Sequence, residues 1–417
     1  MGFCAVSYNG HDMTKPLDAD VLVVGAGPAG STTAYLLARQ GWDVLLVDRA
    51  HFPRPKTCGD GLTPRAVAAL HRLGLLPQLL EAGYPRVEGA RMVAPAGHEW
   101  GVRFAEVVRQ MPGYGLSVPR VELDEWLRRQ AVSAGARFLG GFHAQAALRG
   151  DGLVNGVQGW LAGQVQTIHA RLTVAATGVS IGLPRTLGVM DRLPLVVQAV
   201  RAYFEGVEGL DGTFEFHFYC QLPSGYAWIF PGPKGQANVG LGLFPAGGPH
   251  HTNPKELLNE FLNQPHVRQR FRNARLLGQF QAHPLRTDYP DSPVCGPGFL
   301  LVGEAAGLVN PVTGEGIDLA LESGEIAAAI VGDALAQGDV SARALRRYER
   351  TLHRRFARWF VGLRRLAPWV MRPQALNILI AKAARWPELG RTIVGVILGT
   401  ASPWLAFSPR TWWYILR

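Results

Sequence analysis

The stretch DADVLVVGAGPAGSTTAYLLARQGWDVLLVDRA, residues 18–50, decides the fold class. Residues 21–24 and 43–47 are apolar runs and residues 28–39 have helical composition, so the sequence predicts strand, tight turn, helix and strand. Gly25, Gly27 and Gly30 have the spacing G-x-G-x-x-G, and Asp48 closes the second strand. This order predicts a Rossmann-like domain that binds a dinucleotide.

Each residue of this glycine motif, together with Asp48, has a physical role in binding a dinucleotide. Gly25 makes the turn, Gly27 lets the backbone approach a pyrophosphate, and Gly30 permits close packing of helix on strand. The helix N-terminus faces the phosphates, and Asp48 can accept hydrogen bonds from a ribose. The predicted cofactor-binding residues of this stretch are Gly25, Gly27, Ala29, Gly30, Asp48 and Arg49.

The composition is that of a globular protein with a sizeable core. The chain has 417 residues, of which 47% are hydrophobic and 18% charged, so two or three packed units are expected. The four cysteines Cys4, Cys58, Cys220 and Cys295 form no CxxC pair and have no zinc-ligand spacing. We therefore expect no disulfide framework and no metal site. Residues 1–20 lack the pattern of a secretory signal, and a reducing, cytoplasmic setting fits best.

The net charge of +10 is concentrated at the end of the chain. Residues 341–417 carry fifteen Arg or Lys against two acids, and six of the eleven tryptophans. Arg and Trp interleaved with aliphatic residues are typical of a lipid interface, so we expect a basic helical tail in peripheral contact with a membrane. Two alternatives stay open: a helical cap with solvated cations, and a membrane span within residues 392–409, which Gly399, Ser402 and Pro403 interrupt. No nucleic-acid module accompanies the charge, so nucleic acid is not an expected partner.

A second fingerprint lies in GPGFLLVGEAAGLVNPVTGEGIDLALESGEIAAAIVGDAL, residues 296–335. A strand over residues 299–302 is followed by a Gly-Glu pair, a Gly-rich loop and an Ala-rich helix. This order resembles the second FAD fingerprint of p-hydroxybenzoate hydroxylase-type flavoproteins, with Glu in place of the usual Asp. The resemblance implies FAD rather than NAD, and it implies a helix N-terminus under the flavin pyrimidine. The residues it assigns to FAD are Gly303, Glu304, Gly314, Gly316 and Ile317.

Two further positions bear on the cofactors. Thr177-Gly178 stands where the flavoproteins carry an Asp-Gly pair. Because relatives use that region for FAD and for the pyridine nucleotide, NADPH and another reductant both stay open. Arg120 matches a family position that contacts the cofactor, although it can also be an ordinary cation at a helix start.

A closer resemblance comes from two segments: FPRPKTCGDGLTPRAVAALHRLGL, residues 52–75, and GYAWIFPGPKGQANVGLGL, residues 225–243. They resemble the geranylgeranyl reductase family of flavoproteins, which saturate isolated double bonds in prenyl chains of lipids, quinones and chlorophyll precursors. The CGDGL variant looks most like the bacterial members that act on menaquinone side chains. The resemblance covers residues 18–335 in order and weakens over the tail.

The resemblance implies that Cys58 and Gly59 lie close to the flavin ring, with Cys58 facing the reacting alkene. An isolated alkene is not electrophilic, so the site needs a weak acid that stays protonated at neutral pH, and a thiol with a pKa of about 8.5 meets this need. Lys56 and Arg54 would lower that pKa and favour thiolate. Three interpretations stay open: Cys58 as the acid, Cys58 as a positioning residue beside a water held partly by Asp60, and Cys58 as a packing residue.

An aromatic stripe is the predicted substrate contact. Tyr226, Trp228 and Phe230 alternate along an expected strand that ends at Pro231, so their rings point to one face. Such a face suits a prenyl chain and a cation-like transition state, although aromatic stripes are also common in cores.

We predict an α/β protein with a Rossmann-like FAD-binding domain, an inserted mainly β substrate domain and a C-terminal helical segment, as in p-hydroxybenzoate hydroxylase-like proteins. The FAD-binding domain takes residues 18–75, 118–188 and 283–340, the substrate domain 76–117 and 189–282, and the tail 341–417. The predicted function is FAD-dependent reduction of isolated C=C bonds in a geranylgeranyl or polyprenyl chain of a lipid or quinone. Two alternatives are a flavin monooxygenase acting on a hydrophobic or aromatic substrate and a redox-neutral cyclase that uses FAD structurally, the latter motivated by Thr177 and Glu304. We expect a cytoplasmic, membrane-associated enzyme.

Overall fold

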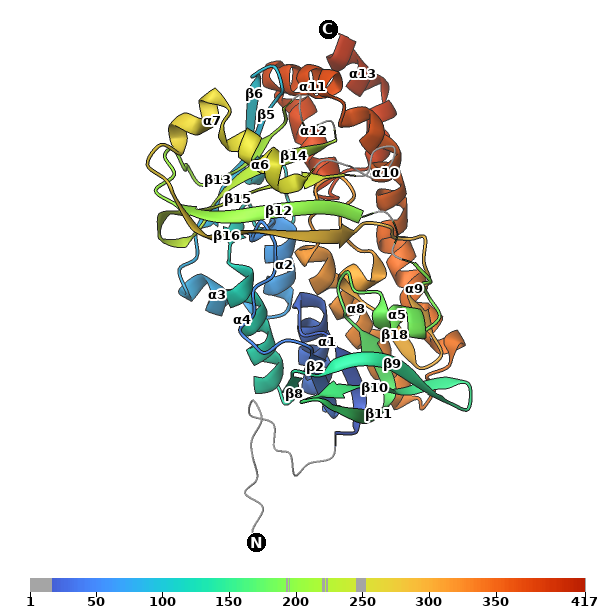
Figure 1. Ribbon diagram of the computed structural model, residues 1–417. Helices are drawn as coiled ribbons and strands as arrows, with labels where there is room; N and C mark the ends of the chain where they lie inside the picture. The colour runs from blue at the N-terminus through green and yellow to red at the C-terminus, as the bar shows by residue number, and fades with distance from the viewer. Residues whose placement is uncertain are drawn as a thin grey trace.

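The computed structural model describes residues 17–192, 194, 196–219, 222, 224–244 and 253–416. Two large sheets organise the chain, and the C-terminal helices run beside both of them (Figure 1). The predicted α/β architecture is therefore confirmed.

The first sheet carries the dinucleotide fingerprint. Its order is β17-β18-β11-β1-β2-β8, and β10 and β9 are attached through β11. The bounds are β1 (Ala19–Val24), β2 (Val44–Asp48), β8 (Arg137–Gly140), β9 (His143–Gly150), β10 (Leu153–Leu161), β11 (Gln164–Ala175), β17 (Cys295–Gly296) and β18 (Phe299–Leu301). β1 pairs in parallel with β2 and β11, and β11 with β18. Continuous apolar runs form these strands because a parallel sheet is buried on both faces.

Several helices accompany the first sheet, and the first of them begins where the sequence predicts. Helix α1 (Pro28–Arg39) has the predicted bounds, and Pro28 suits its first position because proline lacks the N–H that a helix leaves unpaired there. Helix α8 (Ile317–Ala336) follows the second fingerprint and packs on α1, as does α4 (Arg120–Ser133). The short helix α5 (Gly182–Thr186) follows β11.

The second sheet has seven strands in the order β16-β12-β15-β14-β13-β5-β6. The bounds are β5 (Gly89–Val93), β6 (Glu99–Arg103), β12 (Val196–Glu205), β13 (Thr213–His217), β14 (Gly225–Pro231), β15 (Gln236–Leu243) and β16 (Arg275–Arg286). Helices α6 (Pro254–Leu262) and α7 (Pro265–Arg270) lie beside it (Figure 1). The strand β14 is the predicted aromatic strand.

A small third sheet, β3-β7-β4, connects the two regions. Its strands are β3 (Gly61–Leu62), β4 (Arg86–Val87) and β7 (Gly115–Ser117), and helices α2 (Pro64–Arg72) and α3 (Leu76–Glu81) lie between β3 and β4 in the chain. The β3–β7 pairing crosses a predicted domain boundary, and β16 continues past the boundary at residue 283. The division of the chain into domains stays a prediction.

The tail is helical, as predicted, and it packs on both sheets. Its elements are α9 (Ala342–Leu352), the π-helical turn η4 (His353–Ala357), α10 (Arg358–Val370), α11 (Pro373–Arg385), α12 (Pro387–Ile397) and α13 (Pro409–Leu416). Tyr348 and Phe360 are buried in the core of the first sheet, whereas Met371 and Val394 join the core of the second.

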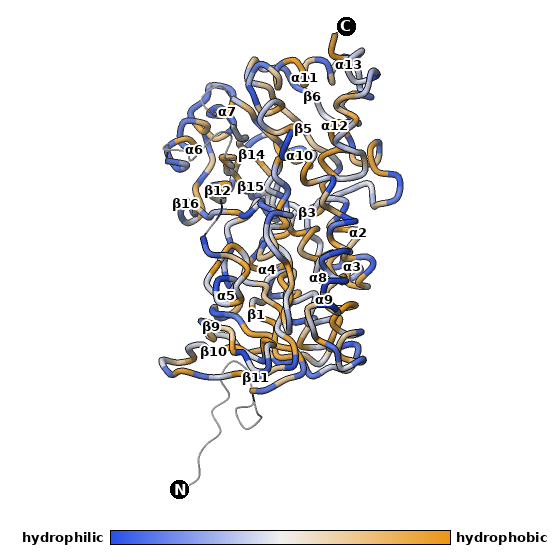
Figure 2. Tube along the Cα trace, turned by 90° about the vertical axis from the view of Figure 1, so that its right-hand side faces the viewer, coloured by the Kyte–Doolittle hydropathy of each residue, from blue (hydrophilic) through white to orange (hydrophobic). Residues whose placement is uncertain are grey.

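The alternative of a membrane span over residues 392–409 is wrong. Helix α12 ends at Ile397, and Gly399 then has a φ of +72°, which turns the chain. Figure 2 shows hydrophobic and hydrophilic residues alternating along the tail helices. Within the residues that the structure describes, no helix combines the length and apolar composition that crossing a bilayer requires.

Candidate active site

A cavity of about 1060 Å³ lies where the two large sheets and the tail meet. One part of its wall comes from both fingerprints and the other from the aromatic strand, with the loop of Cys58 contributing to the same wall. Typical small-molecule sites occupy roughly 300–1,000 Å³, so this volume suits a dinucleotide together with a second ligand.

The first fingerprint forms a backbone cradle. Gly25 has a φ of +110°, and a Cβ there would collide with the Ala176 carbonyl oxygen. A Cβ on Gly30 would collide with the Gly25 carbonyl oxygen, so Gly30 serves the packing of helix on strand and is not part of the cavity wall. Gly27 and Ala29 do line the cavity.

Gly27 is the position in this cradle where the backbone is accessible to a ligand. A Cβ at Gly27 would meet only the Arg54 Nη2 atom, at 3.6 Å, so the backbone there faces free space at the N-terminus of α1. This is the geometry that a pyrophosphate requires, and the residues present therefore fit FAD.

Asp48 and Arg49 also line the cavity. The Asp48 carboxylate accepts hydrogen bonds from the backbone N–H groups of Ala26, at 2.8 Å, and Ala50, at 2.9 Å. These bonds hold the carboxylate at the end of β2, and lone pairs remain for a ribose hydroxyl.

The second fingerprint lines the cavity with Glu304, Gly314, Gly316 and Ile317. Gly303 lies behind this wall, has a φ of +60°, and a Cβ there would come within 2.8 Å of the Ala29 Cβ. The longer side chain of Glu304 reaches protein partners, since its Oε2 lies 3.4 Å from Lys56 Nζ and its Oε1 accepts from the Arg286 backbone N–H at 3.2 Å.

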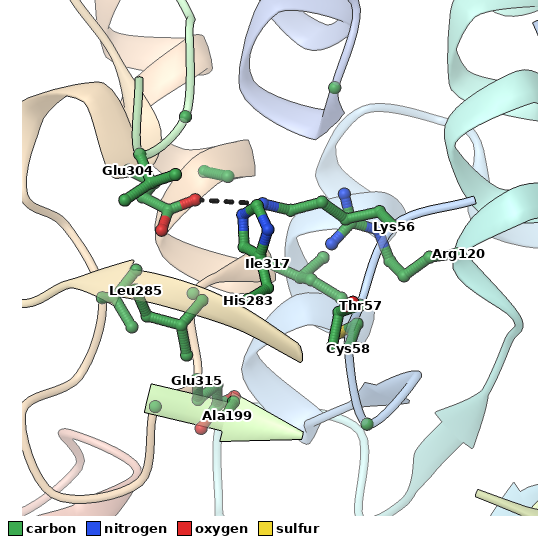
Figure 3. Close-up of a pocket in the computed structure, with 18 of the residues that line it drawn as sticks. Lys56, Thr57, Cys58, Arg120, Ala199, His283, Leu285, Glu304, Glu315 and Ile317 are labelled. Atoms are coloured by element: carbon green, nitrogen blue, oxygen red, sulfur yellow. Dashed lines mark hydrogen bonds and ion pairs between the residues drawn. The ribbon is translucent and has the colours of Figure 1, made fainter. Parts of the chain in front are cut away.

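The two cations beside Cys58 in the sequence are directed to other partners. Lys56 Nζ lies 2.7 Å from His283 Nε2 as well as near Glu304 (Figure 3), and Arg54 Nη1 lies 3.1 Å from the Asp124 carboxylate. Burial and the charge of Lys56 lower the pKa of His283 to about 4, so His283 is neutral and can accept from Lys56.

The expectation that Lys56 and Arg54 lower the pKa of Cys58 is wrong. Removal from water raises the pKa of the thiol, and the cation that partly offsets this effect is Arg120. Cys58 therefore lines the cavity as a neutral thiol. Because the two neighbouring cations are paired elsewhere, sequence proximity overstated their influence.

The structure agrees with both interpretations of Arg120, as a residue of the cofactor site and as a cation at a helix start. It is the first residue of α4, its Nε and Nη2 donate to the Asp124 carboxylate at 2.7 and 2.8 Å, and it lines the cavity.

Asp60 lies under the Cys loop and is not among the residues that line the cavity. It has a φ of +63°, a conformation that costs a non-glycine residue on the order of 1–3 kcal/mol. Its carboxylate accepts from the Arg120 backbone N–H at 3.0 Å, from Tyr203 Oη at 2.6 Å and from Asn238 Nδ2 at 2.8 Å. These contacts favour a role in holding the loop over the predicted role in holding a water.

The aromatic strand faces the cavity. Tyr226, Trp228 and Phe230 all line it, and the centroid of the Trp228 ring lies 6.1 Å from each neighbouring ring. Pro231 ends the strand and is not among the lining residues. A Cβ on Gly59 would come within 3.0 Å of the Phe230 ring, so the Cys loop packs directly on the aromatic face.

Sequence reasoning missed several residues of the site. Asn238 links the aromatic strand to the Cys loop, and its signal is an amide within an otherwise apolar strand. Glu315 carries an ionisable group between the two glycines of the second fingerprint. The tail residues Met371, Val394, Ile397 and Leu398 complete the apolar wall and had no local signal.

Comparison with known proteins agrees with this geometry. Residues 18–198 match the FAD binding domain family, and residues 197–280 match the geranylgeranyl reductase catalytic domain. The chain is 34% identical to the digeranylgeranylglycerophospholipid reductase 2 of Methanopyrus kandleri, over 82% of this chain and 84% of the relative. It is 37% identical to the menaquinone reductase of Mycobacterium tuberculosis, over 86% and 85%.

Solved structures share the fold. A geranylgeranyl bacteriochlorophyll reductase-like protein from Thermoplasma acidophilum aligns with a TM-score of 0.78 at 24% identity, over 91% of this chain and 99% of that one. A flavin-dependent brominase aligns with a TM-score of 0.75 at 21% identity, over 92% and 94%.

Proposed function

This chain belongs to the geranylgeranyl reductase family of FAD-dependent oxidoreductases, and we propose that it saturates isolated C=C bonds in the polyprenyl chain of a quinone or a membrane lipid. The observation that carries this proposal is the shared cavity wall. The FAD fingerprints, the neutral Cys58 thiol and the aromatic strand line one continuous space.

The residues of the cavity have separate duties in this reaction. Bound reduced FAD supplies a hydride. The backbone at Gly27 and the N-terminus of α1 bind the pyrophosphate, and Glu304 with Asp48 binds cofactor hydroxyls. Tyr226, Trp228 and Phe230 exclude water from the alkene and stabilise positive charge that develops on it.

Cys58 acts at the reacting centre as a thiol that stays protonated, in contact with substrate or flavin. Asp60 is a positioning residue, because all three of its hydrogen bonds hold the loop that carries Cys58. Arg120 supports the same loop through its backbone N–H, and its side chain lines the cavity while it is paired with Asp124.

The reductant is a further proposal. Thr177 lines the cavity, and its hydroxyl donates to the Ser180 carbonyl oxygen at 3.0 Å. No charge stands at this position, and we propose that NADPH reduces the enzyme more slowly than a small chemical reductant does. Stopped-flow reduction of the bound flavin by NADPH and by dithionite tests this.

The tail supplies a membrane-docking surface, which we define as the exposed aromatic residues Trp369, Trp404, Phe407, Trp412 and Trp413. Arg372 lies over Trp369 and Arg365 over Trp404, with cation-to-centroid distances of 4.6 and 6.0 Å. Indole rings beside cations suit the headgroup region of an anionic membrane. Because Met371, which follows α10, and Val394 and Ile397 of α12 also form part of the cavity wall, we propose that a prenyl chain passes from the cytoplasmic membrane face into the cavity beside them.

The proposed reaction is tested by incubating chemically reduced enzyme, without oxygen, with a prenylated quinone and with a geranylgeranyl lipid. A reductase adds two hydrogen atoms per saturated bond while the flavin turns yellow. A monooxygenase stays idle until oxygen enters and then adds one oxygen atom, and a redox-neutral cyclase leaves the mass unchanged. Product gain of oxygen, or isomerisation by oxidised enzyme, would contradict the proposal.

A further inference from the structure

A carboxyl group that the predicted chemistry does not use lies in the wall of the cavity. Glu315 stands in the loop before α8 and lines the cavity together with Cys58 (Figure 3). Tyr226 lines the same cavity. Its Oε1 atom is buried and has no hydrogen-bond partner among the described residues. Since buried polar atoms without partners are rare and costly, this oxygen calls for a functional explanation.

The charges around Glu315 do not balance when every acid is ionised. Arg65 Nε lies 2.6 Å from Glu322 Oε1 and 3.6 Å from Asp318 Oδ2, and Arg355 Nη2 lies 2.9 Å from Glu322 Oε2. Three carboxyl groups thus face two guanidinium groups. One bound proton makes the cluster neutral, which is favourable for the buried groups Arg65, Asp318 and Glu322, whereas the Arg355 side chain is 54% exposed to water.

The location of that proton follows from the partners of each acid. Glu322 is bound by both arginines, and although burial opposes it, the hydrogen bond from Arg65 holds the pKa of Glu322 below its ordinary value. Burial raises the pKa of Glu315 well above the usual range, and the nearby Asp318 carboxyl raises it further, against smaller opposing effects of Thr63 and Arg65. Burial also raises the pKa of Asp318, but Asp318 does not line the cavity.

We propose that Glu315, held as a neutral carboxylic acid, donates the proton that accompanies hydride transfer; this inference rests on the proposed reductase function. The π electron pair of the alkene forms a C–H bond to the Glu315 proton as the O–H bond breaks, and the resulting tertiary carbon accepts a hydride from reduced FAD. The alkene gains two hydrogens, FAD is oxidised, and the Glu315 carboxylate regains its proton from water after the product leaves.

Glu315 is better suited to this step than the thiol. Burial raises the pKa of both groups, so both are held neutral, and of the two side chains the carboxylic acid has the lower ordinary pKa. The Tyr226 hydroxyl donates to the carbonyl oxygen of Thr313, two residues before Glu315, and Tyr226 lines the same cavity, where an aromatic ring can stabilise a developing cation. Cys58 then positions the alkene or the flavin.

The first test requires no turnover. A protonated carboxylic acid has a carbonyl infrared band that a carboxylate lacks, and Glu315→Gln should remove this band from the oxidised enzyme at neutral pH. The matched control is Glu325→Gln, because Glu325 lies on α8 in an ion pair with Arg72, 2.7 Å away, and outside the cavity wall. The control should keep the band, and an unchanged spectrum in Glu315→Gln would overturn the proposal.

The second test is anaerobic single turnover with a prenylated quinone. Glu315→Gln should keep FAD and substrate affinity but lose about 100-fold or more in the rate of double-bond saturation, and Glu315→Asp should recover part of the rate. The wild-type rate should fall as pH rises through the Glu315 pKa, because only the protonated form donates, and this fall should be absent in Glu315→Gln. The other charged or titratable groups of this cluster and of the adjoining cavity wall are Arg65, Asp318, Glu322, Arg355, Tyr226 and Cys58, of which Tyr226 and Cys58 are neutral. To assign the pH dependence to Glu315, the infrared band must titrate with the rate.

The outcomes separate the two proposals. If the wild-type enzyme saturates the quinone and Glu315→Gln does so at the same rate, the role of Glu315 is overturned but the reductase function is not. A wild-type enzyme that saturates no double bond overturns the reductase function, and the role of Glu315 with it. If Glu315→Gln fails to hold FAD, the wild-type enzyme decides: a carbonyl infrared band that does not titrate together with the saturation rate would contradict the proposal.

Discussion

Asn238 donates from its side-chain Nδ2 to the main-chain carbonyl oxygen of Cys58 at 2.8 Å. The same Nδ2 donates to Asp60 at 2.8 Å, while Asn238 Oδ1 accepts from Trp228 Nε1 at 2.9 Å. One amide therefore holds the loop of Cys58 against the Trp228 ring, which lines the cavity.

Replacing Asn238 by Ala should lower both stability and activity. The Cys58 carbonyl oxygen and the Trp228 N–H would lose their partner inside the protein, and an unpaired buried group costs roughly 1–3 kcal/mol. Urea unfolding and saturation rate should both change in this variant. Asn273→Ala is the control, because Asn273 is exposed and, within the described part of the chain, its side chain donates to the surface residue Glu208 alone. Equal behaviour of the two variants would show that the amide link is dispensable.

Replacing Gly27 by Ala should remove FAD without unfolding the protein. The new Cβ would make only an ordinary contact with Arg54, at 3.6 Å, but it would occupy space that the pyrophosphate needs. Flavin absorbance and thermal melting measure the two effects. Gly30→Ala should instead lower the melting temperature, because its Cβ collides with the Gly25 backbone. A fully yellow Gly27→Ala protein would refute the placement of the pyrophosphate.

Replacing Cys58 by Ala should keep FAD and lose most turnover, since the thiol lies at the aromatic part of the cavity and away from the phosphate cradle. Flavin content and single-turnover rate are the measurements. Cys295→Ala is the control, because Cys295 lies on β17, outside the cavity wall. Full activity in Cys58→Ala would reduce Cys58 to a packing residue.

The raised pKa of Cys58 makes a separate prediction about reactivity. A raised pKa means that less thiolate is present at any given pH, so alkylation of Cys58 by iodoacetamide should be slow at pH 8 and should accelerate only above the ordinary thiol pKa of about 8.5. Peptide mass mapping of alkylated protein over a pH series measures this, with unfolded protein as the control. Faster alkylation of the folded enzyme than of the unfolded chain would show that nearby cations dominate.

The docking surface predicts a loss of vesicle binding in point variants. Trp369→Ser together with Trp412→Ser should weaken binding to vesicles that contain anionic phospholipid, and salt should weaken it further, because each cation near such a surface contributes about 1 kcal/mol before screening. Trp160→Ser is the control, since Trp160 is equally exposed on β10 but belongs to the other end of the molecule. Binding that neither the variants nor salt affects would favour a tail whose cations are merely solvated.

Truncation after about residue 338 would be a poor test of the same surface. It would remove Tyr348, Phe356 and Phe360 from the core of the first sheet and Met371 from the cavity wall. Loss of binding would then reflect unfolding.

The sequence by itself determined the local structure that depends on residues close together in the chain. The turn, helix and buried strands of residues 18–50 follow from glycine spacing and apolar runs, and α1 has the predicted bounds. The common face of Tyr226, Trp228 and Phe230 likewise follows from strand alternation, and all three rings line the cavity.

Only the tertiary structure decided the properties that arise between segments far apart in the chain. Asn238 and Cys58 are separated by 180 positions, so no local pattern reveals their bond. The thiol and the Glu315 carboxyl owe their raised pKa values to loss of water, which depends on what packs around them. Met371 and Leu398 of the tail complete the apolar wall of the cavity, and nothing in the local sequence predicts this. Hydrophobic burial is not directional, so the fold decides against which surface these side chains pack.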